Sequence, residues 1–401
     1  MQSEKKLVQT SEKIIYELLF KVFSGEYSGI ALNEVLKKTI KDKQYITRVF
    51  YGVLEKNVQL DFIIGELTAT RPKKPALIIL KIGLYLLRFS NTPKHSAIDK
   101  TVSVAKQIGK KDLSGFINAV LRKSLDYVVQ TSDLAINLSV PGWIIKLLQK
   151  HYDDEFIKKM FDTTEYRTHI RSNKVLFDKT ELGYLATKAQ LDSLNKNDYT
   201  IMSLSSMLAV KNYISGFDKN DKLNVLDLCA APGGKAVYLK ELLPNARVVA
   251  CDIHAHRLEL IKAYANTRGV DIQILQNDAT IFNAKWQNKF DLVICDVPCS
   301  GLGVRQKPDV FINRKPEDIA VLNKLQLDIL QNGSKYVALN GTLCYSTCTI
   351  LKEENEEIIE KFLALNKDFG LIEWQNLYPQ NHNSDGFFIA KTLRKHMFGH
   401  N

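Results

Sequence analysis

The first third of the chain repeats apolar residues at helical spacing. In the segments 13–23 ("KIIYELLFKVF"), 96–109 ("SAIDKTVSVAKQIG") and 114–125 ("SGFINAVLRKSL"), apolar positions recur every three to four residues, the period of an amphipathic α-helix. No run in this region alternates apolar and polar residues as a half-buried strand would. Residues 1–130 are therefore predicted to form an all-α bundle of about five to seven helices.

One window in this region is more apolar than the others. "ALIILKIGLYLLRF" (76–89) contains Lys81 and Arg88 and is shorter than the ~20 residues of a membrane-spanning helix. It is predicted to be a core helix, and no membrane partner is expected. The polar start "MQSEKKLVQTSEK" lacks the apolar stretch of a secretory signal.

The next region, residues 131–215, has a mixed pattern. "SVPGWIIKLLQKHY" (139–152) predicts a short helix after a Pro-Gly turn, "THIRSNKVLF" (168–177) a strand, and "ELGYLATKAQLDSL" (181–194) a helix. This part is interpreted as a small α+β connector.

Residues 216–401 alternate apolar strand-like runs with helical patterns. Such alternation, with strands that are apolar throughout, favours a parallel sheet covered on both faces, as in Rossmann-like α/β domains. A terminal hairpin is expected from the last two runs, 371–378 and 386–393. The predicted parallel strands are 224–230, 247–253, 272–278, 291–297 and 341–348.

The positive charge is concentrated in the predicted helical region. The 401-residue chain has a formal net charge of +11, of which residues 1–130 supply 22 Lys+Arg against 12 Asp+Glu, or +10. A basic domain joined to a neutral one suggests a polyanionic partner such as a nucleic acid. All six cysteines lie in the C-terminal half, which favours a reducing, cytoplasmic location over a disulfide framework.

The loops that follow the predicted strands carry the candidate binding residues. "CAAPGGK" (229–235) offers a Gly-Gly turn that lets backbone approach a ligand, and Asp252 follows it at the distance typical of a ribose-binding acid. Asp278 and Asp296 follow the next two strands. Neither a dinucleotide fingerprint nor a P-loop is present. The pattern fits a nucleoside ligand without a pyrophosphate, such as S-adenosylmethionine.

Two cysteines lie just past strand ends. Cys299 and Cys348 are 49 positions apart, which leaves room for one helix and one strand between them. If their strands are neighbours, both thiols open toward one site with Asp296. A zinc site formed with Cys295 and Cys344 is the rival, but these two residues lie inside apolar runs, where packing is the expected role. No metal is predicted.

Two thiols, a carboxylate and a methyl donor suit one reaction. Carbon 5 of a pyrimidine is a poor nucleophile until a thiolate adds to carbon 6, after which carbon 5 can attack an activated methyl group. Removal of the carbon-5 proton then expels the thiolate. A carboxyl group at the edge of the base can stabilise the ring during the adduct's lifetime.

The motifs "LDLCAAPGGK", "DVPCSGLGV", "YSTCT" and "DGFFIAK" resemble those of the RNA cytosine-C5 methyltransferases of the NOL/NOP2/Sun (RsmB/NOP) family. The N-terminal stretch, with "KIGLYLLRFSNTPKHSAIDKTVSVAKQIG" and "SGFINAVLR", resembles the helical NusB-like RNA-binding domain. That pairing is typical of bacterial enzymes that methylate 16S rRNA. The resemblance covers nearly the whole chain and implies a class I S-adenosylmethionine-dependent fold at residues 216–401.

The resemblance also implies roles for individual residues. Cys348 would be the nucleophile, Cys299 would assist proton removal and product release, and Asp296 would face the cytosine. In the arrangement of DNA cytosine methyltransferases, Cys299 would instead be the nucleophile. The cofactor site implied by the resemblance comprises Cys229, Ala230, Ala231, Pro232, Gly233, Gly234, Lys235, Asp252, Asp278 and Asp296.

The sequence departs from the family pattern in the connector. Where the family reads like "VQDxSS", this chain has "IMSLSS" (201–206), with Met202 and Ser203 in place of a polar pair, and the stretch after "RSN" (171–173) is short. Both departures concern the part expected to face RNA. The expected substrate is 16S rRNA, and the protein is expected to bind it as a monomer. The alternatives are a transfer RNA enzyme and an inactive RNA-binding or ribosome-assembly factor.

Overall fold

The structure divides into two compact units. One comprises Met1–Asp154 with Lys307–Arg314, and the other comprises Glu155–Gln306 with Lys315–Asn401. The computed structural model of the protein describes residues 10–38, 41–161, 168–172, 174, 178–180, 182–195, 198–304, 308–382 and 384–395.

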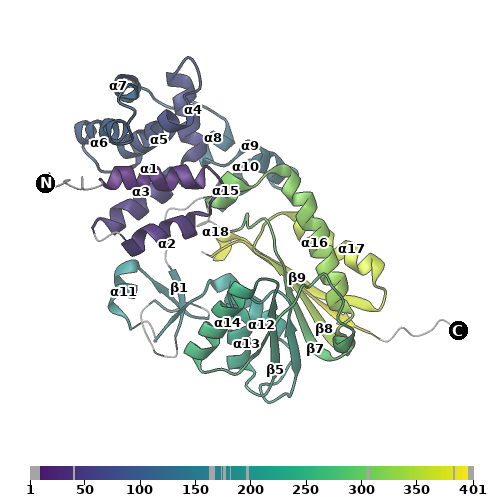
Figure 1. The fold of residues 1–401 in the computed structure, drawn as a ribbon. Helices are drawn as coiled ribbons and strands as arrows, with labels where there is room; N and C mark the ends of the chain where they lie inside the picture. Colours follow the sequence, from purple (N-terminus) through teal and green to yellow (C-terminus); the bar gives the residue numbers. More distant parts are fainter. Residues whose placement is uncertain are drawn as a thin grey trace. The chain divides into compact units, whose positions relative to one another are not determined.

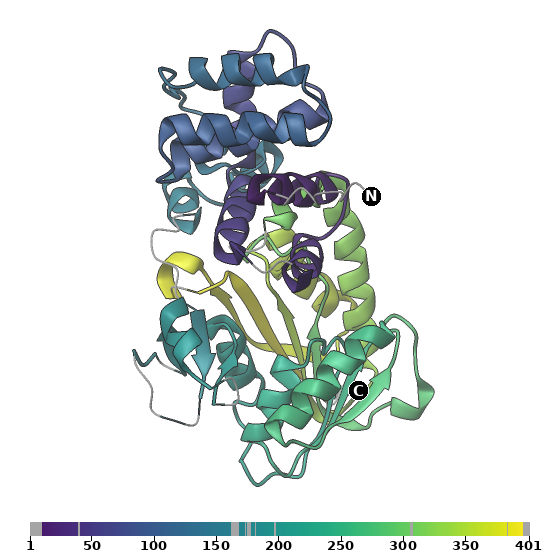
Figure 2. The ribbon, with the colours of Figure 1, turned by 60° about the vertical axis from the view of Figure 1, so that its left-hand side comes forward.

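Among its described residues the first unit contains helices and no strand (Figure 2). Seven of these helices lie between residues 10 and 123, which confirms the predicted bundle. Its helices are α1 (Ser11–Val22), α2 (Ser28–Lys38), α3 (Lys43–Glu55), α4 (Asn57–Leu67), α5 (Lys74–Phe89), α6 (Lys94–Gln107), α7 (Leu113–Lys123), α8 (Leu134–Leu138), α9 (Gly142–Leu148) and α15 (Asp309–Asn313).

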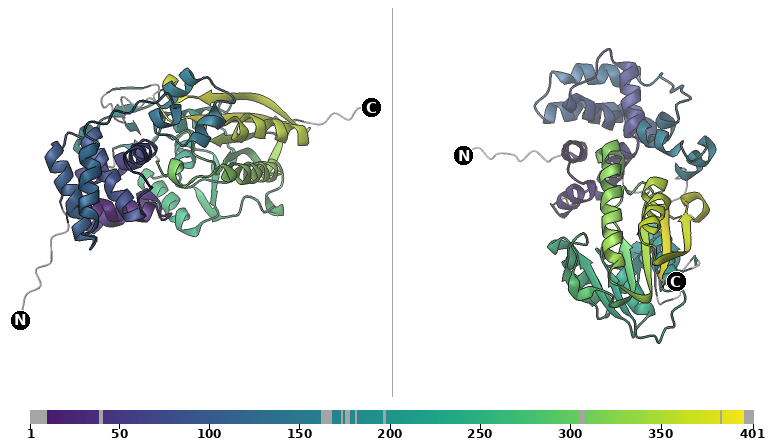
Figure 3. Two further views of the ribbon diagram at one scale, coloured as in Figure 1. Left: turned by 90° about the horizontal axis from the view of Figure 1, so that it is seen from above. Right: turned by 90° about the vertical axis from the view of Figure 1, so that its right-hand side faces the viewer.

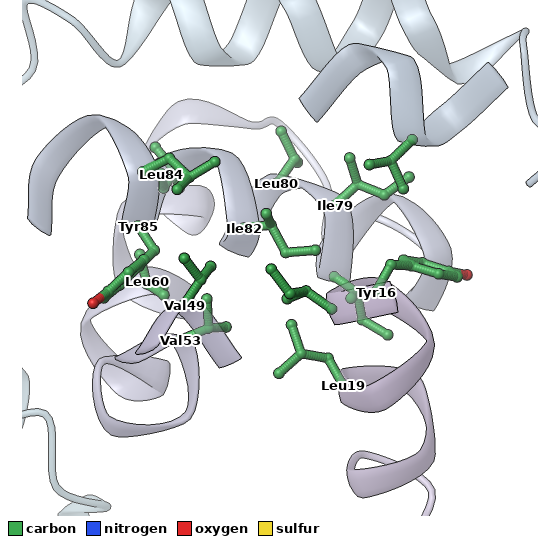
Figure 4. Packing of buried hydrophobic residues seen from close by; sticks show 14 of the residues in the cluster. Tyr16, Leu19, Val49, Val53, Leu60, Ile79, Leu80, Ile82, Leu84 and Tyr85 are labelled. Atoms are coloured by element: carbon green, nitrogen blue, oxygen red, sulfur yellow. The ribbon is translucent and has the colours of Figure 1, made fainter. Parts of the chain in front are cut away.

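Helix α5 is the centre of this bundle. It contacts α1, α3, α4, α6 and α7, and side chains such as Leu80, Ile82 and Leu84 are fully buried among them (Figure 4). The charge of buried Lys81 is compensated, because its Nζ donates to Asp61 Oδ2 at 2.9 Å. The apolar window 76–89 is thus a core helix, as predicted. Among the described residues, no helix has the length and apolar content needed to cross a bilayer.

The second unit begins with a small antiparallel sheet. Its strands β1 (Thr168–Arg171), β2 (Tyr184–Ala186) and β3 (Thr200–Ile201) lie in the order β2-β1-β3. The helices before, between and after these strands in the chain are α10 (Asp154–Phe161), α11 (Lys188–Ser193) and α12 (Leu204–Tyr213). The predicted strand 168–177 is found for its first four residues, whereas residues 173 and 175–177 lie outside the described residues.

The prediction of a helix over 181–194 is wrong for the first half of this segment. Tyr184–Ala186 forms a strand, and the helix begins only after a capping box in which Thr187 accepts from the backbone N–H of Gln190. Pairing with β1 overrides the helical pattern. A Cβ at Gly183 would lie 2.4 Å from the carbonyl oxygen of Ile170, so only glycine lets the two segments approach this closely.

The small sheet is fastened to the larger domain through Arg171. Its guanidinium lies 4.0 Å from the ring centroid of Tyr238, pairs with Glu241 and donates to the hydroxyl of Tyr264 at 3.4 Å. Arg268 donates to the other oxygen of Glu241 at 2.7 Å. The arginine of "RSN" therefore joins β1 to α13 (Gly234–Leu242) and α14 (Ala255–Arg268).

The larger sheet has seven strands in the order β6-β5-β4-β7-β8-β10-β9. The first five in this order are parallel, and β10 and β9 add an antiparallel edge. All five predicted parallel strands and the terminal pair are confirmed. The strands are β4 (Asn224–Asp227), β5 (Arg247–Asp252), β6 (Gln273–Gln276), β7 (Phe290–Asp296), β8 (Val337–Thr347), β9 (Phe369–Leu377) and β10 (Phe387–Arg394).

Helices cover both faces of this sheet. Figure 1 shows α12, α13 and α14 together on one side, and α16 (Pro316–Ser334) and α17 (Glu356–Leu365) on the other. Figure 3 shows the same arrangement from two further directions. Each side has its own apolar core, and fully buried Cys344 and Cys295 belong to opposite cores. The short helix α18 (Pro379–His382) lies between β9 and β10.

Candidate active site

The residues predicted to be functional lie at the carboxyl ends of the parallel strands. β4 ends at Asp227, β5 at Asp252 and β7 at Asp296. Because β5 and β7 flank β4 in the sheet, these three ends are adjacent. Strand order reverses at β4, and the edge beside such a reversal is where open α/β sheets bind ligands.

The loop after β4 carries the Gly-Gly turn. Gly233 has a positive φ of 107°, and a Cβ there would lie 3.1 Å from the Cα of Ile261, so the turn needs glycine. No atom lies within 4 Å of a Cβ built on Gly234, which leaves space beside the first turn of α13. Burial raises the pKa of the Cys229 thiol well above its usual range, so Cys229 can serve the loop only as a neutral side chain and through its backbone.

The loops after β5 and β6 supply two further acids. Asp252, which is buried, pairs with Arg257 at 3.1 Å, and Arg257 also donates to the carbonyl of Ala231 at 3.1 Å. This arginine therefore links the acid to the Gly-Gly loop. Asp278 accepts from the backbone N–H and the hydroxyl of Thr280, at 2.9 and 2.7 Å.

Asp227 lies beneath these loops with one oxygen unsatisfied. The side chain is 1% exposed, its Oδ1 accepts from the backbone N–H of Cys229 at 3.3 Å, and its Oδ2 has no partner among the described residues. Burial and the charge of Asp296 raise the pKa of Asp227 to about 7. A buried oxygen of this kind is suited to a cationic or hydrogen-donating group of a ligand.

Asp296 is held by two donors. Lys235 Nζ donates to Oδ2 at 2.7 Å, and Ser346 Oγ donates to Oδ1 at 2.6 Å. Burial favours the neutral amine of Lys235, but Asp296, Cys348 and Asp227 together outweigh it and raise the pKa of Lys235. The pair is therefore an ammonium facing a carboxylate.

The two candidate thiols are neighbours. Cys299 Sγ lies 3.2 Å from Cys348 Sγ and 3.3 Å from the backbone nitrogen of Cys348, which donates to it. The contact follows from the register of β7 and β8, in which Asp296 is opposite Ser346. The hydrogen bond to Cys348 and burial raise the pKa of Cys299 well above its usual range, so Cys299 is a thiol at neutral pH.

A buried carboxylate joins the two loops that carry these thiols. Glu354 Oε1 accepts from the backbone N–H of Ser300 at 2.8 Å and from Gln326 Nε2 at 2.9 Å, and Gln326 also donates to the carbonyl of Pro298 at 3.0 Å. A second link is the 2.9 Å hydrogen bond between the hydroxyls of Ser300 and Thr349. These contacts fix the segment around Cys299 against the segment after β8.

Two glycines let a third loop approach the same place. The N–H of Gly303 donates to the carbonyl of Cys348 at 3.0 Å, and the N–H of Gly386 donates to the carbonyl of Gly303 at 2.8 Å. A Cβ on Gly303 would lie 2.2 Å from the carbonyl oxygen of Gly386. The "CSGLG" and "DGFF" motifs are thus joined by backbone contacts that exclude a side chain.

Replacing Gly303 with alanine is expected to reduce the activity of this site about 100-fold, since the added Cβ must push apart two loops whose position sets the site and a shift of about 1 Å can cost that much. Steady-state rates of the variant and the wild type would measure this. Gly115→Ala is the matched control, because no atom lies within 4 Å of a Cβ built there. Equal activities of the two variants would contradict the expectation.

The chain is similar to known proteins over most of its length. A model of the family "16S rRNA methyltransferase RsmB/F" matches residues 217–393, and a NusB family model matches residues 9–126. Ribosomal RNA small subunit methyltransferase B of Shewanella oneidensis is 30% identical over 422 residues, which cover 95% of this chain and 97% of the relative. The chain belongs to the RsmB/F family of 16S rRNA methyltransferases.

Other matches agree with this assignment. Ribosomal RNA small subunit methyltransferase B of Escherichia coli K12 is 30% identical over 414 residues, with 92% of this chain and 95% of the relative covered. The solved structure of PH0851 superposes with a TM-score of 0.79 over 97% of this chain and all of that one, at 22% identity, and so shows the same fold. The chain has the two-domain organisation of an RsmB/F enzyme with a NusB domain.

RsmB/F enzymes use S-adenosylmethionine as methyl donor, and the site fits this cofactor. Asp227 Oδ2 would accept from its ammonium group and Asp252 from its ribose, and the loop containing Gly233 and Gly234 would offer backbone to it. The fit rests on the unsatisfied acidic oxygen and on the space beside Gly234. The cofactor supplies an electrophilic methyl group.

The structure brings together most of the residues predicted from the sequence. The loop 229–235 and Asp252 share one part of the strand-end edge, while Asp296, Cys299 and Cys348 share another, with Lys235 linking the two. Cys295 and Cys344 are buried in the sheet, and within the described parts of the chain no group of three His, Cys, Asp or Glu side chains could hold a metal ion.

Sequence reasoning missed several supporting residues. Asp227 lies inside the motif "LDLCAAPGGK" and Ser346 inside "YSTCT", so both could have been predicted as site residues from these motifs. Glu354 lies outside any motif, and no local pattern points to it. At the first of the two departures, "IMSLSS", Met202 is buried in an apolar core and Ser203 caps α12 by accepting from the backbone N–H of Ser206, so both residues support the fold of this helix.

Proposed function

We propose that the protein transfers a methyl group from S-adenosylmethionine to carbon 5 of a cytosine in 16S rRNA, through a covalent bond between Cys348 and carbon 6 of the base. The observation that carries the proposal is the 3.2 Å contact between the Cys299 and Cys348 thiols beside the Asp296–Lys235 pair. Two thiols next to a base-binding carboxylate suit addition to carbon 6 and later release. The substrate follows from the family.

Each residue has one task in the proposed reaction. Cys348 Sγ, as a thiolate, forms a bond to carbon 6, and the electron pair of the 5,6 double bond moves into the ring so that carbon 5 can take the methyl group. Asp296 binds the edge of the base. The proton on carbon 5 then leaves to water with the assistance of Cys299, and the electron pair of that bond restores the 5,6 double bond. The bond between carbon 6 and Cys348 breaks with release of the thiolate, to which the neighbouring neutral thiol of Cys299 can donate.

The charges of the site support Cys348 as the nucleophile. Lys235 carries a positive charge that interacts with Cys348, and a neighbouring cation favours the thiolate. Cys299 has a raised pKa and remains a thiol, which makes it a poor competitor for the attack. The alternative order, with Cys299 as nucleophile, lacks this electrostatic support.

RNA that carries tritium on carbon 5 of its cytosines tests the site of methylation. We expect one tritium released to water for each methyl group transferred to small-subunit ribosomal RNA, because the carbon-5 proton must leave. Methyl transfer without tritium release would place the methyl group elsewhere and refute the proposal. Cys348→Ala serves as the blank for exchange that does not require catalysis.

The same assay separates the alternatives. Faster transfer to transfer RNA than to 16S rRNA would indicate the other substrate class. RNA binding without transfer to either RNA would indicate a binding or assembly factor. The intact site of Cys348, Cys299, Asp296 and Lys235 supports an enzyme.

We further propose a division of tasks along the chain. Residues 1–130 bind RNA, residues 131–215 face the RNA near the target, and residues 216–401 carry out methyl transfer. The protein is proposed to act as a monomer in the cytoplasm, where ribosomal RNA is made. Light scattering of the purified full chain, with and without RNA, tests the oligomeric state.

A further inference from the structure

Helix α12 places a tyrosine hydroxyl directly behind the proposed catalytic carboxylate. Tyr213 is the last residue of α12 and is fully buried in the apolar core between this helix and the sheet. Its hydroxyl lies 2.5 Å from Ser346 Oγ, and Ser346 Oγ lies 2.6 Å from Asp296 Oδ1. Three side chains from α12, β8 and β7 thus form a continuous hydrogen-bonded chain.

The chemistry of the three groups determines which of them donates in each hydrogen bond. Asp296 is a carboxylate facing the ammonium of Lys235, so it can only accept. Ser346 has a single hydroxyl hydrogen and gives it to Asp296, which means that the 2.5 Å contact must be donated by Tyr213. Burial raises the pKa of Tyr213 well above its usual range and keeps the phenol protonated for this purpose.

These hydrogen bonds determine which lone pairs of Asp296 remain for a substrate. Ser346 occupies Oδ1 from one side, and Lys235 occupies Oδ2 at 2.7 Å. A carboxylate has about four acceptor positions, so two held positions orient the other two. Consecutive hydrogen bonds also strengthen one another in a medium of low dielectric constant.

We propose that Tyr213 is a positioning residue for methyl transfer, which acts through Ser346 to hold Asp296 in the orientation that binds the base. This inference rests on the proposed function of Asp296. It predicts a role for the hydroxyl itself, because a phenylalanine ring would fill the same apolar space and leave only the hydrogen-bonded chain broken. Ser205, two turns earlier on α12, is likewise hydrogen-bonded to the loop before β10, since its Oγ lies 2.8 Å from Ser384 Oγ.

The test compares Tyr213→Phe, Ser346→Ala and the double variant. We expect kcat for methyl transfer to fall about 10-fold in Tyr213→Phe, with KM for RNA changed less than twofold. The double variant should be no slower than Ser346→Ala alone, since both changes break one chain.

Tyr336→Phe is the matched control. Tyr336 is also fully buried, and its hydroxyl accepts from the backbone N–H of Asn283 at 2.8 Å and from Asn332 Nδ2 at 3.1 Å, near the opposite end of β8. It should lower Tm by an amount similar to Tyr213→Phe while kcat stays near the wild-type value. Additive losses in the double variant, or an unchanged kcat in Tyr213→Phe, would overturn the inference.

Failure of the proposed function gives a different result. Total methyl transfer to RNA measures kcat whatever atom is methylated, whereas tritium release reports carbon 5 alone. A wild-type enzyme that transfers methyl groups without releasing tritium would refute the carbon-5 proposal. The coupling between Tyr213 and Ser346 would still be measurable in that enzyme.

Discussion

Replacing Cys348 with alanine is expected to reduce methyl transfer by about 1,000-fold or more, because the covalent route through carbon 6 is then closed. Replacing Cys299 with alanine is expected to have a different consequence. The adduct still forms, but the residue that assists loss of the carbon-5 proton and release of Cys348 is missing, so protein and RNA stay joined. A denaturing gel with labelled RNA and S-adenosylmethionine would show a slowly migrating band for Cys299→Ala and none for Cys348→Ala.

The outcome distinguishes the two possible orders of the cysteines. An adduct that accumulates in Cys348→Ala and not in Cys299→Ala would show that Cys299 attacks. Cys251→Ala is the control for loss of a thiol from the same domain, since Cys251 is fully buried, with a pKa raised by burial to about 12. It should transfer methyl groups at the wild-type rate and leave no band.

RNA binding is expected to weaken by roughly 1,000-fold or more between 50 and 200 mM salt if the helical domain neutralises six or more phosphates. Its excess of +10 over residues 1–130 makes it the expected source of this dependence. Lys106, Lys110 and Lys111 are exposed at the end of α6 and in the turn before α7. Changing all three to glutamine should lower the slope of log Kd against log salt by about 2.7, since each lost phosphate contact contributes about 0.9.

The control carries the same change of charge on the other unit. Lys219, Lys222 and Lys289 are exposed in the methyltransferase domain, and their change to glutamine should leave the slope within about 0.5 of the wild-type value. Fluorescence anisotropy of a labelled rRNA fragment across a salt series measures both slopes. Equal slopes for the two triple variants would show that RNA binding does not depend on these lysines of the helical domain.

The strands and helices followed from the sequence because their signals are local. The apolar periodicity of 96–109 reports which side of one helix is buried, and each apolar run that ends in a polar loop reports a strand of a covered sheet. The prediction was wrong at 181–194, where Tyr184–Ala186 pairs with β1. A local pattern does not contain the hydrogen bonds that a distant strand offers.

The motifs determined the family, the cofactor and the proposed roles of Cys299, Cys348 and Asp296, since each motif keeps its chemical groups within a few residues. Only the tertiary structure decided how these groups meet. The Tyr213–Ser346 contact joins positions 133 apart, and the Ser300–Glu354 contact joins positions 54 apart. Such pairs depend on helix packing and strand register, which set the final distance between atoms. Residue order fixes the chemistry available, and packing decides which groups act together.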